Sequence, residues 1–395
     1  MNWRRKSKSD WGRLDLNFKN LSEVSDYVNE RVKVENLTVE NYISTENMLP
    51  NKGGIDKATK LPSAKTTSLY SKGDILLSNI RTYFKKIWYA EKDGGCSNDV
   101  LVVRARGEIE PKFLYYVLSN DKFFEYSSAT SKGTKMPRGD KSAIMQYQIP
   151  DMPLEEQRTI VSVLSALDDR IAENKKINHH LAEIAKSIFD SYFIDLSPYD
   201  GVMPDDWQLS NLTGIANYLN GLAMQKHRPQ SNEQGLPVLK IKELRQGFTD
   251  STSDLCSSNI RRDYIIHDGD VIFSWSGSLL VDFWTGGDCG LNQHLFKVSS
   301  ETYDKWFYYA WTKHHLDRFV KMAADRATTM GHIKRDALEK AEVLIPSNKD
   351  YQEIGNKLKP IYDQIINNRV ESRKLVALRD TLLPKLMSGE ISVTD

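Results

Sequence analysis

One long amphipathic helix pattern occurs twice in this chain of 395 residues. The segment LEEQRTIVSVLSALDDRIAENKKINHHLAEIAKSIFDSYF runs from Leu154 to Phe193, and DYQEIGNKLKPIYDQIINNRVESRKLVALRDTLLPKLMSG runs from Asp350 to Gly389. Each copy follows a block that lacks this periodicity, at residues 1–152 and 197–348. A helix with one apolar stripe cannot remain exposed to water, so each copy needs a partner, and the other copy is the nearest one available.

The apolar residues of both segments fall on a heptad. The positions predicted to face the partner helix are Leu164, Leu167, Ile171, Asn174, Leu181 and Ile188 in the first segment, and Ile361, Ile365, Asn368, Leu375 and Leu382 in the second. A buried Asn fixes the register of paired helices, because any slip leaves its amide without a partner. Pro360 predicts a kink or a delayed start of the second helix. We therefore expect an antiparallel two-helix coiled coil that carries the two blocks at opposite ends.

The two blocks are also copies of each other. KGDILLS begins at Lys72 and DGDVIFS begins at Asp268, 196 residues later, and an Ile-Pro pair closes the blocks at 149–150 and 345–346. Two unrelated domains would not keep this spacing, so the chain contains one module used twice. The predicted division is a first module over 1–152, a helix over 153–196, a second module over 197–348 and a second helix over 349–395.

Each module mixes two kinds of pattern. The runs DILLSNI, DVLVVRA, DVIFSWS and HLFKVSS are short, rich in Val, Ile and Phe, and bounded by turn residues, which is typical of strands. The aromatic runs PKFLYYVLSNDKFFEYSS and YDKWFYYAWTKHHLDRFVKM have helical spacing. These patterns predict an α+β class, in which each module has a curved, mostly antiparallel sheet and one prominent helix, with pseudo-twofold symmetry between the two modules.

The composition is that of an ordinary globular protein, with 40% hydrophobic and 27% charged residues. No window approaches about 18 uninterrupted apolar residues. Three solitary cysteines, Cys96, Cys256 and Cys289, lack the spacing of a zinc site or a redox pair, so we expect reduced thiols. The sequence therefore indicates a cytoplasmic protein without a membrane segment.

The net charge of +1 hides a local difference. Residues 1–152 carry 25 Lys and Arg against 19 Asp and Glu, a net charge of +6, whereas residues 197–348 have a net charge of −3. Any binding of nucleic acid must therefore use local clusters of basic residues.

No catalytic or metal-binding pattern is visible. The sequence has neither a phosphate loop nor a dinucleotide-binding turn, and SPYD from Ser197 is only a faint echo of the adenine methyltransferase motif. The adjacent histidines at 179–180 and 314–315 face different directions on a helix, so they are expected to be solvated surface. We predict no catalytic residue and no metal site.

The order module, heptad helix, module, heptad helix resembles the specificity subunit of type I restriction-modification enzymes. The segment from Ile149 to Phe193, with its EEQR and NKKIN patterns, is similar to the central conserved region of that family, and the segment from Ile345 is similar to its C-terminal region. The GD-[IV] motifs resemble those of its target recognition domains. One departure is Asp350–Gln352 (DYQ), where Glu-Glu-Gln would be expected.

This resemblance implies a non-enzymatic chain that binds double-stranded DNA. Each module would read one half of a bipartite asymmetric sequence, while the paired helices set the gap. The partners would be methyltransferase (modification) subunits and a translocating restriction subunit. S-adenosylmethionine, ATP and Mg would then belong to the partners, and no cofactor to this chain.

Loop residues of the modules are the candidates for contacting DNA. Arg can bond two acceptors on guanine, Asn can do the same for adenine, and Lys mostly contacts phosphate. The candidates are Asn79, Arg81, Lys85, Lys86, Lys132, Lys135 and Arg138 in the first module, and Ser274, Ser276, Asn292, Gln293, Arg326, Thr328 and Lys334 in the second. The loops just before the two Ile-Pro pairs are favoured, because they occupy matching positions and are rich in basic residues and Gly. Solvated surface remains the alternative for each single residue.

Two other functions stay open at this point. A single-chain restriction-modification fusion would need catalytic motifs that the sequence does not show. A coiled-coil adaptor with protein-binding modules, or a coiled coil that only dimerises the protein, would need no preference for any DNA sequence.

Overall fold

The computed structural model describes residues 17–133, 135–324 and 335–391. It contains two compact units. One unit comprises the described residues up to Asp168 together with those from Val376 onward, and the other comprises Asp169–Leu375. Each unit therefore holds one module and a part of each long helix, and we describe the two units separately.

The first module contains two four-stranded sheets and a two-stranded ribbon. Its elements are β1 (Phe18–Asn20), α1 (Leu21–Val24), β2 (Ser25–Tyr27), β3 (Arg31–Lys33), η1 (Val34–Asn36), β4 (Tyr42–Ile43), β5 (Thr66–Tyr70), β6 (Ile75–Ser78), η2 (Thr82–Phe84), β7 (Ile87–Tyr89), β8 (Gly94–Cys96), β9 (Val100–Ala105), α2 (Pro111–Leu118), α3 (Asp121–Ala129), α4 (Lys141–Ile144) and β10 (Gln148–Pro150). One sheet has the order β2-β9-β6-β7 and is antiparallel throughout. The other has the order β3-β5-β8-β4, with β4 parallel to β8, and β1 pairs with β10.

The second module repeats this plan. Its elements are β11 (Gln208–Asn211), α6 (Leu212–Ile215), β12 (Asn217–Asn220), η5 (Met224–Lys226), β13 (Leu236–Leu239), α7 (Ile241–Gln246), β14 (Leu255–Cys256), η6 (Arg262–Tyr264), β15 (Ile265–Ile266), β16 (Val271–Ser274), β17 (Leu280–Phe283), β18 (Cys289–Leu291), β19 (Leu295–Ser299), α8 (Lys305–His314), α9 (Leu316–Ala324), α10 (Arg335–Glu339) and β20 (Glu342–Ile345). The sheets have the orders β12-β19-β16-β17 and β14-β13-β18-β15, and β11 pairs with β20.

The four predicted strand runs correspond to β6, β9, β16 and β19, the central strands of the matching antiparallel sheets. The second sheets also match in three strands, because β8 and β18 each lie between one parallel and one antiparallel neighbour. The fourth strand differs: β3 pairs with β5, whereas β14 pairs with β13. The two modules thus share a scaffold and differ at one sheet edge.

The prediction of one prominent helix per module is wrong, because each aromatic run is broken into two helices. In the first module the break falls at Asn120, whose side chain accepts a hydrogen bond from the backbone N–H of Lys122 at 3.0 Å and so caps α3. In the second module it falls at His315, whose ring donates to the carbonyl of Glu342 at 2.8 Å. The first of these bonds is local and the second joins distant parts of the chain, and neither break is visible in the periodicity of the run.

The repeated Gly-Asp motif forms the same turn in both modules. Gly73 and Gly269 have φ of +95° and +87°, a conformation that favours glycine. Asp74 then accepts from the backbone N–H of Ser71 at 2.7 Å, and Asp270 accepts from that of His267 at 2.9 Å. The motif is therefore a structural turn that starts the central strand.

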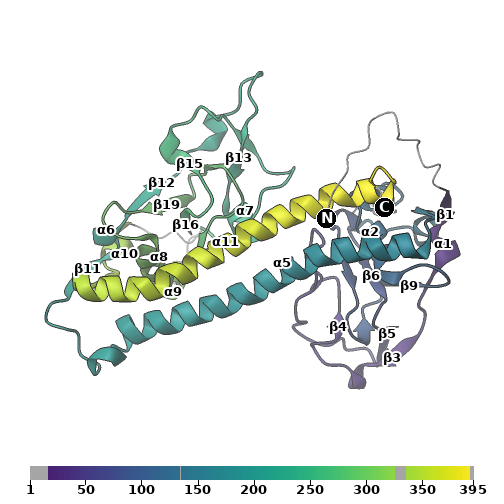
Figure 1. Cartoon of the computed structure of the whole chain (residues 1–395), viewed down its shortest axis with the longest axis horizontal. Helices are drawn as coiled ribbons and strands as arrows, with labels where there is room; N and C mark the ends of the chain where they lie inside the picture. The colour runs from purple at the N-terminus through teal and green to yellow at the C-terminus, as the bar shows by residue number, and fades with distance from the viewer. Residues whose placement is uncertain (1–16, 134, 325–334, 392–395) are drawn as a thin grey trace. The chain divides into compact units, whose positions relative to one another are not determined.

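The two long helices are α5 (Leu154–Phe189) and α11 (Asn348–Met387), drawn in teal and yellow in Figure 1. A π-helical turn, η3 (Asp190–Ile194), and a 3-10 turn, η4 (Ser197–Tyr199), follow α5. The predicted delay of the second helix at Pro360 is wrong, because α11 begins twelve residues earlier and continues through this proline. Within the described residues, no helix is long and apolar enough to cross a membrane.

Asparagines form a polar network between the helices. The side-chain amide of Asn174 donates to the main-chain oxygen of Asn368 at 3.3 Å, and that of Asn368 donates to the side-chain oxygen of Asn178 at 2.9 Å. Arg170 also forms an ion pair with Glu371 at 3.0 Å. The numbers of the α5 residues rise from 170 to 174 to 178, while those of their partners on α11 fall from 371 to 368 to 365. The two helices therefore run antiparallel here.

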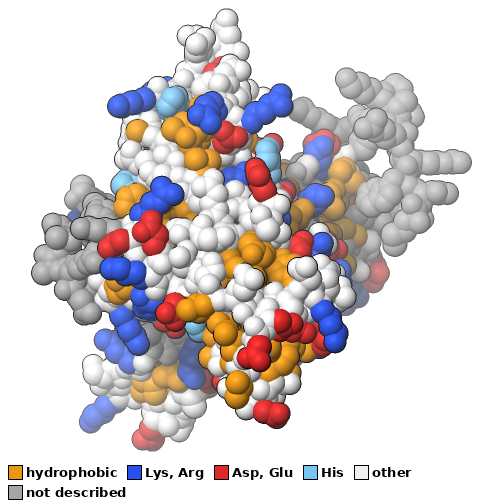
Figure 2. Space-filling view, turned by 90° about the vertical axis from the view of Figure 1, so that its left-hand side faces the viewer, with side chains coloured by type: hydrophobic (Ala, Val, Ile, Leu, Met, Phe, Trp, Pro, Cys, Tyr) orange, Lys and Arg blue, Asp and Glu red, His pale blue; other side chains and the backbone are white. Residues whose placement is uncertain are grey.

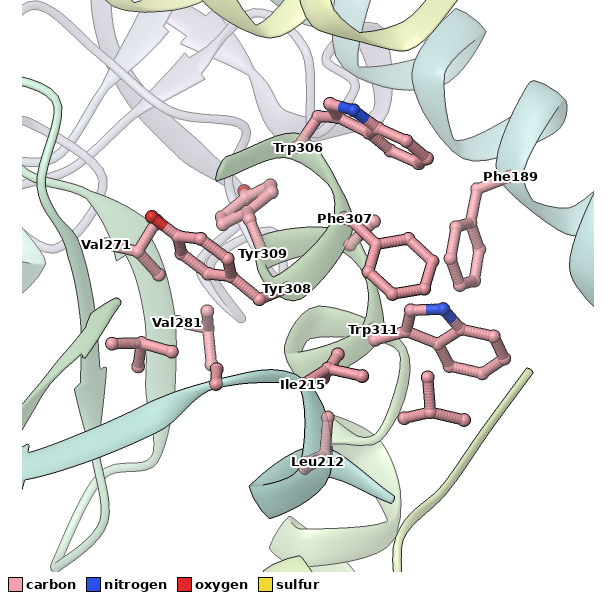
Figure 3. Packing of buried hydrophobic residues seen from close by; sticks show 14 of the residues in the cluster. Phe189, Leu212, Ile215, Val271, Val281, Trp306, Phe307, Tyr308, Tyr309 and Trp311 are labelled. Atoms are coloured by element: carbon pink, nitrogen blue, oxygen red, sulfur yellow. The ribbon is translucent and has the colours of Figure 1, made fainter. Parts of the chain in front are cut away.

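Residues of both long helices complete the core of each module. In the first unit, Ile160 and Leu164 of α5 and Leu383 and Leu386 of α11 belong to the same buried cluster as Phe113. In the second unit the cluster contains residues of α5 and of the beginning of α11, namely Ala185, Phe189, Ile354, Leu358, Tyr362 and Ile365. Figure 3 shows Phe189 beside Trp311 of α8, with ring centroids 5.1 Å apart.

The residues predicted to pair the helices are buried or half-buried. Leu164, Ile171, Asn174, Ile365 and Asn368 are buried, and Leu167, Leu181, Ile188, Ile361, Leu375 and Leu382 are half-buried. Leu181, Ile188, Ile361 and Ile365 share the core cluster of the second unit, and Leu164 and Leu382 share that of the first.

Arginines of α11 add ion pairs within each unit. In the second unit, Arg369 contacts Asp282 at 2.8 Å and Arg373 contacts Asp268 at 2.7 Å. In the first unit, Arg379 contacts Asp168 of α5 at 2.8 Å. The hydroxyl of Tyr116 on α2 donates to the same carboxylate, also at 2.8 Å, so this carboxylate connects both helices to the first module.

Candidate nucleic-acid interface

Three loops of the first module are joined by backbone hydrogen bonds. The N–H groups of Asn51 and Lys52 donate to the carbonyls of Phe84 and Lys85, both at 2.8 Å, and the N–H of Arg81 donates to the carbonyl of Pro137 at 2.8 Å. We call residues 50–54, 79–86 and the described part of 131–139 the first loop cluster. It contains all seven candidate residues of this module.

The backbone of the first loop cluster is unusual. The structure has six non-glycine residues with positive φ in its described part, and four of them lie here: Asn51 (55°), Lys52 (60°), Arg81 (51°) and Lys85 (52°). Such conformations are unfavourable for residues with a Cβ and persist only where the surroundings impose them, often at functional sites. The strain marks this cluster as the candidate site of the first module.

The basic residues of the cluster differ in how free they are. Arg81 and Lys135 are exposed, and neither has an ion pair among the described residues. Lys132 contacts Asp140 at 2.5 Å and Arg138 contacts Asp99 at 2.9 Å, both with exposed side chains. These four residues are accessible to a polyanion.

Two lysines of the cluster are held by the protein itself. Lys85 forms an ion pair with Asp121 at 3.0 Å. The amine of Lys86 donates to the carbonyl of Thr45 at 2.6 Å, and partial burial lowers its pKa. Both amines therefore already have partners within the protein, and these contacts help to hold the loops in place.

Asn79 is buried, with only 6% of its surface exposed. Its backbone N–H donates to Asp99 at 2.8 Å, and its carbonyl accepts from Gly139 at 3.1 Å. Its side chain is buried within the module, an environment that does not favour the base contact predicted for it. Its role here is to hold the strand end against the 131–139 loop.

The second module gives a similar correction. Ser274, Ser276 and Asn292 are buried, at 0%, 2% and 4% exposure. The hydroxyl of Ser276 contacts the ring of His294 at 3.1 Å, and the side chain of Asn292 accepts from the backbone of His294 at 3.3 Å. These side chains make contacts within the module, whereas Gln293 is half-exposed. Arg326, Thr328 and Lys334 lie outside the described residues.

Sequence reasoning missed accessible residues in both modules. In the second, Leu222 is hydrogen-bonded to Leu291 and Gln293, and the same loop presents the exposed side chains of Gln225, Lys226 and Arg228. The basic run QKHR was a usable signal. In the first module, the exposed side chains of Tyr83, Phe84 and Met136 were missed, because aromatic and thioether side chains are usually interpreted as core.

Metal-binding groups and cysteines were the remaining chemical features to locate in the described part of the chain. The described residues include no group of three or more His, Cys, Asp and Glu side chains that could hold a metal ion. Cys96 and Cys289 are buried, and desolvation raises the pKa of each thiol to about 12, so neither is a reactive thiolate. Figure 2 shows Lys and Arg interspersed with Asp and Glu on the face that it presents.

An α+β module that occurs twice, each copy followed by a long helix, defines the class of the chain as a protein with two repeated domains. The chain belongs to the type I restriction modification DNA specificity domain family, whose model matches residues 14–183 and 204–374. It is therefore a specificity subunit with two such domains, and it is not itself an enzyme.

Known relatives agree with this assignment. The chain is similar to the type I restriction enzyme MjaIX specificity subunit of Methanocaldococcus jannaschii, with 26% identity over 86% of this chain and 82% of the relative. It is also similar to the HindI specificity subunit of Haemophilus influenzae, with 22% identity over 97% and 100% of the two chains. Its fold is similar to that of the S subunit from M. genitalium, at a TM-score of 0.58 and 16% identity over 95% and 97% of the chains.

Proposed function

We propose that each module reads one half of a bipartite DNA sequence through its loops, while the helix pair sets the gap between the halves. The observation that supports this most is the first loop cluster, in which four left-handed residues and a net of backbone hydrogen bonds hold exposed basic side chains in place. Such preorganisation lowers the conformational entropy that the loops lose when DNA binds. Because the two modules share a scaffold, each half-site would be bound by a module of its own.

The accessible residues divide into two roles. Arg81 and Arg138 are the proposed base readers, because a guanidinium can bond both acceptors of a guanine. Lys132 and Lys135 are the proposed phosphate contacts. In the second module, Gln293, Lys226 and Arg228 are the proposed contacts.

The partners of this chain are proposed to be methyltransferase and restriction subunits of a type I complex, which would bring S-adenosylmethionine, ATP and Mg. A docking position is suggested by Ile184 on α5 and Leu378 on α11, which are 49% and 46% exposed. They lie 194 residues apart, the same offset as Asn174 and Asn368, so they are equivalent positions of the repeat. We place the assembled complex in the cytoplasm.

Competition gel shifts with the methyltransferase subunits present test this function. The expected result is preference for one bipartite sequence over scrambled DNA of equal length. Arg138→Ala should relax the preference at one base position by about 1–3 kcal/mol, whereas Lys135→Ala should weaken binding to all sequences alike. Lys92→Ala, an exposed lysine outside the loop cluster, serves as the control.

The coiled-coil adaptor is the remaining alternative. It predicts equal affinity for the bipartite sequence and the scrambled duplex, and the same competition experiment would show this.

A further inference from the structure

Apolar side chains project from the first loop cluster into solvent. Tyr83 is 52% exposed, Phe84 is 39% exposed and Met136 is 49% exposed. The rings of Tyr83 and Phe84 lie with centroids 4.7 Å apart and planes tilted by 54°. Tyr83 and Phe84 belong to the η2 turn, and Met136 belongs to the loop whose Pro137 is hydrogen-bonded to Arg81. Three large apolar groups thus occur within one set of hydrogen-bonded loops.

Their exposure is built into the fold. The N–H of Phe84 donates to the carbonyl of Arg81 at 2.9 Å, and its carbonyl accepts from Asn51 at 2.8 Å. Thr82, between Arg81 and Tyr83, is buried, and its hydroxyl contacts that of Ser128 at 2.8 Å. Left-handed residues stand on both sides of the turn, at Arg81 and Lys85. A backbone held from so many directions keeps the two rings outward.

The charges around these rings select the ligand. The exposed basic residues of the same loops are Arg81, Lys132, Lys135 and Arg138. Exposed apolar side chains in the same loops as exposed basic ones match duplex DNA, where a hydrophobic base stack lies between two phosphate backbones. A protein partner would need an acidic surface with an apolar centre to match these residues. Duplex DNA already combines both features, and the family is described as a DNA specificity domain, so we favour DNA as the ligand.

We propose that Tyr83 and Phe84, assisted by Met136, form a wedge that enters between adjacent base pairs of the half-site read by the first module. Lys132 and Lys135 hold the flanking phosphates. Insertion of apolar side chains partly unstacks a base step and bends the duplex. The first module would then select its half-site partly by how easily one step opens, and pyrimidine–purine steps open most easily. This inference rests on the proposed function, since it assumes that the module binds DNA.

The second module offers no counterpart in the same place. The connection between β16 and β17 is short and contains no 3-10 turn. Its aromatic residue, Trp275, is half-buried against Phe296 at 5.7 Å, and its indole donates to Asn220 at 3.0 Å. Among the residues that the structure describes, the proposed wedge is therefore assigned to the first module.

A fluorescent base analogue tests the wedge. Duplexes carrying 2-aminopurine at successive positions are bound by the full chain with its methyltransferase partners. The wild-type complex should raise the fluorescence at one step of the first half-site, because 2-aminopurine brightens when it unstacks. Tyr83→Ala combined with Phe84→Ala should abolish that rise and weaken specific binding on the order of tenfold, as expected for losing a stacked base.

Two controls keep the result interpretable. Phe84→Leu keeps an apolar wedge and should retain most of the fluorescence rise. Leu209→Ala removes an apolar side chain that is more exposed than either ring, 63% exposed on β11, and should change nothing. The thermal midpoint of each variant should equal that of the wild type, because the altered side chains contribute little to a core.

The possible failures are distinct. If wild-type complexes show no sequence preference, the proposed function fails. If they bind specifically but no position brightens, or the double variant behaves like the wild type, the wedge is wrong while the proposed function stands. If the double variant loses its methyltransferase partners in the absence of DNA, the rings are a protein contact and the wedge is also wrong.

Discussion

The side-chain amide of Asn368 on α11 donates a hydrogen bond to the side-chain oxygen of Asn178 on α5 at 2.9 Å. The oxygen of Asn368 accepts from Gln364 at 2.6 Å, and the amide of Asn178 donates to the carbonyl of Ile365 at 3.2 Å. Asn368 is only 2% exposed, so these bonds take the place of the hydrogen bonds that its side chain would make to water in the unfolded chain. The network gives the paired helices one favoured alignment.

Replacing Asn368 by Ala should therefore destabilise the helix pair. The change leaves the half-buried side-chain oxygen of Asn178 without its donor, and an unsatisfied buried polar group costs about 1–3 kcal/mol. Urea unfolding followed by circular dichroism measures the loss. Asn367→Ala, its exposed neighbour on the same helix, should stay within about 0.5 kcal/mol of wild type. Equal losses in the two variants would contradict the role of the network.

The pair of Arg379 and Asp168 should show measurable coupling. Their side chains are 18% and 26% exposed, and Tyr116 donates to the same carboxylate. Because water screens this pair only partly, a double-mutant cycle with Ala should give a coupling free energy of about 1–3 kcal/mol. The exposed pair of Arg158 and Glu155 is the matched control and should give less than about 0.5 kcal/mol. Coupling free energies of similar size in the two pairs would contradict the prediction that partial burial strengthens the pair of Arg379 and Asp168.

His315 should make the second module sensitive to mild acid. Burial of its ring lowers its pKa from 6.5 to about 4, while its N–H donates to Glu342. The unfolded chain therefore binds the proton first, so the stability from the neutral ring is present above pH 6.5 and is lost as the pH falls towards 4. Between pH 7 and 4 the loss should reach up to about 3 kcal/mol.

Hydrogen exchange in peptides from α8 and α9 at pH 7 and pH 4.5 measures this effect. Both proteins are compared by the protection that they lose between the two pH values, corrected for the intrinsic exchange rate. This loss should be larger in the wild type than in His315→Gln. Gln keeps a donor for the Glu342 carbonyl but does not titrate. Identical losses in the two proteins would exclude His315 as the sensor.

Lengthening both helices should change the gap and leave the half-sites alone. One heptad inserted beside Asn174 in α5 and one beside Asn368 in α11 adds about 10 Å at 1.5 Å per residue and keeps the phase of the apolar seam. At 3.4 Å per base pair, the preferred gap should grow by about three base pairs. Methylome mapping of cells with each version reads out both the gap and the half-site letters. Altered letters with an unchanged gap would overturn the spacer role.

Much of the scaffold could be predicted, because its strands and long helices follow from local sequence patterns that occur twice in the chain. The strands β6 and β16 followed from apolar runs after the Gly-Asp turn, and the helix pair followed from the heptad. The helix breaks at Asn120 and His315 escaped prediction, since both depend on single hydrogen bonds. Periodicity reports which face of an element is apolar, and it carries no information about such bonds.

The candidate site was harder to predict. Asn79 and Ser276 are polar residues just after strands, a position that indicates surface, yet both are buried by contacts with segments far along the chain. Tyr83 and Phe84 gave the opposite error, because aromatic residues normally enter the core. Which side of a loop faces outward depends on tertiary hydrogen bonds, such as that from Asn51 to Phe84, that no pattern in the sequence displays.

The way in which both long helices close both cores has a consequence for synthesis on the ribosome. The buried cluster of the first module includes Leu383, Leu386 and Met387, which are translated after the whole of the second module. The first module must therefore wait with an unfinished core until the second module and most of α11 have been synthesised. A nascent chain that stops before these residues would carry an apolar opening in its first module, where chaperones and proteases recognise exposed hydrophobic surface.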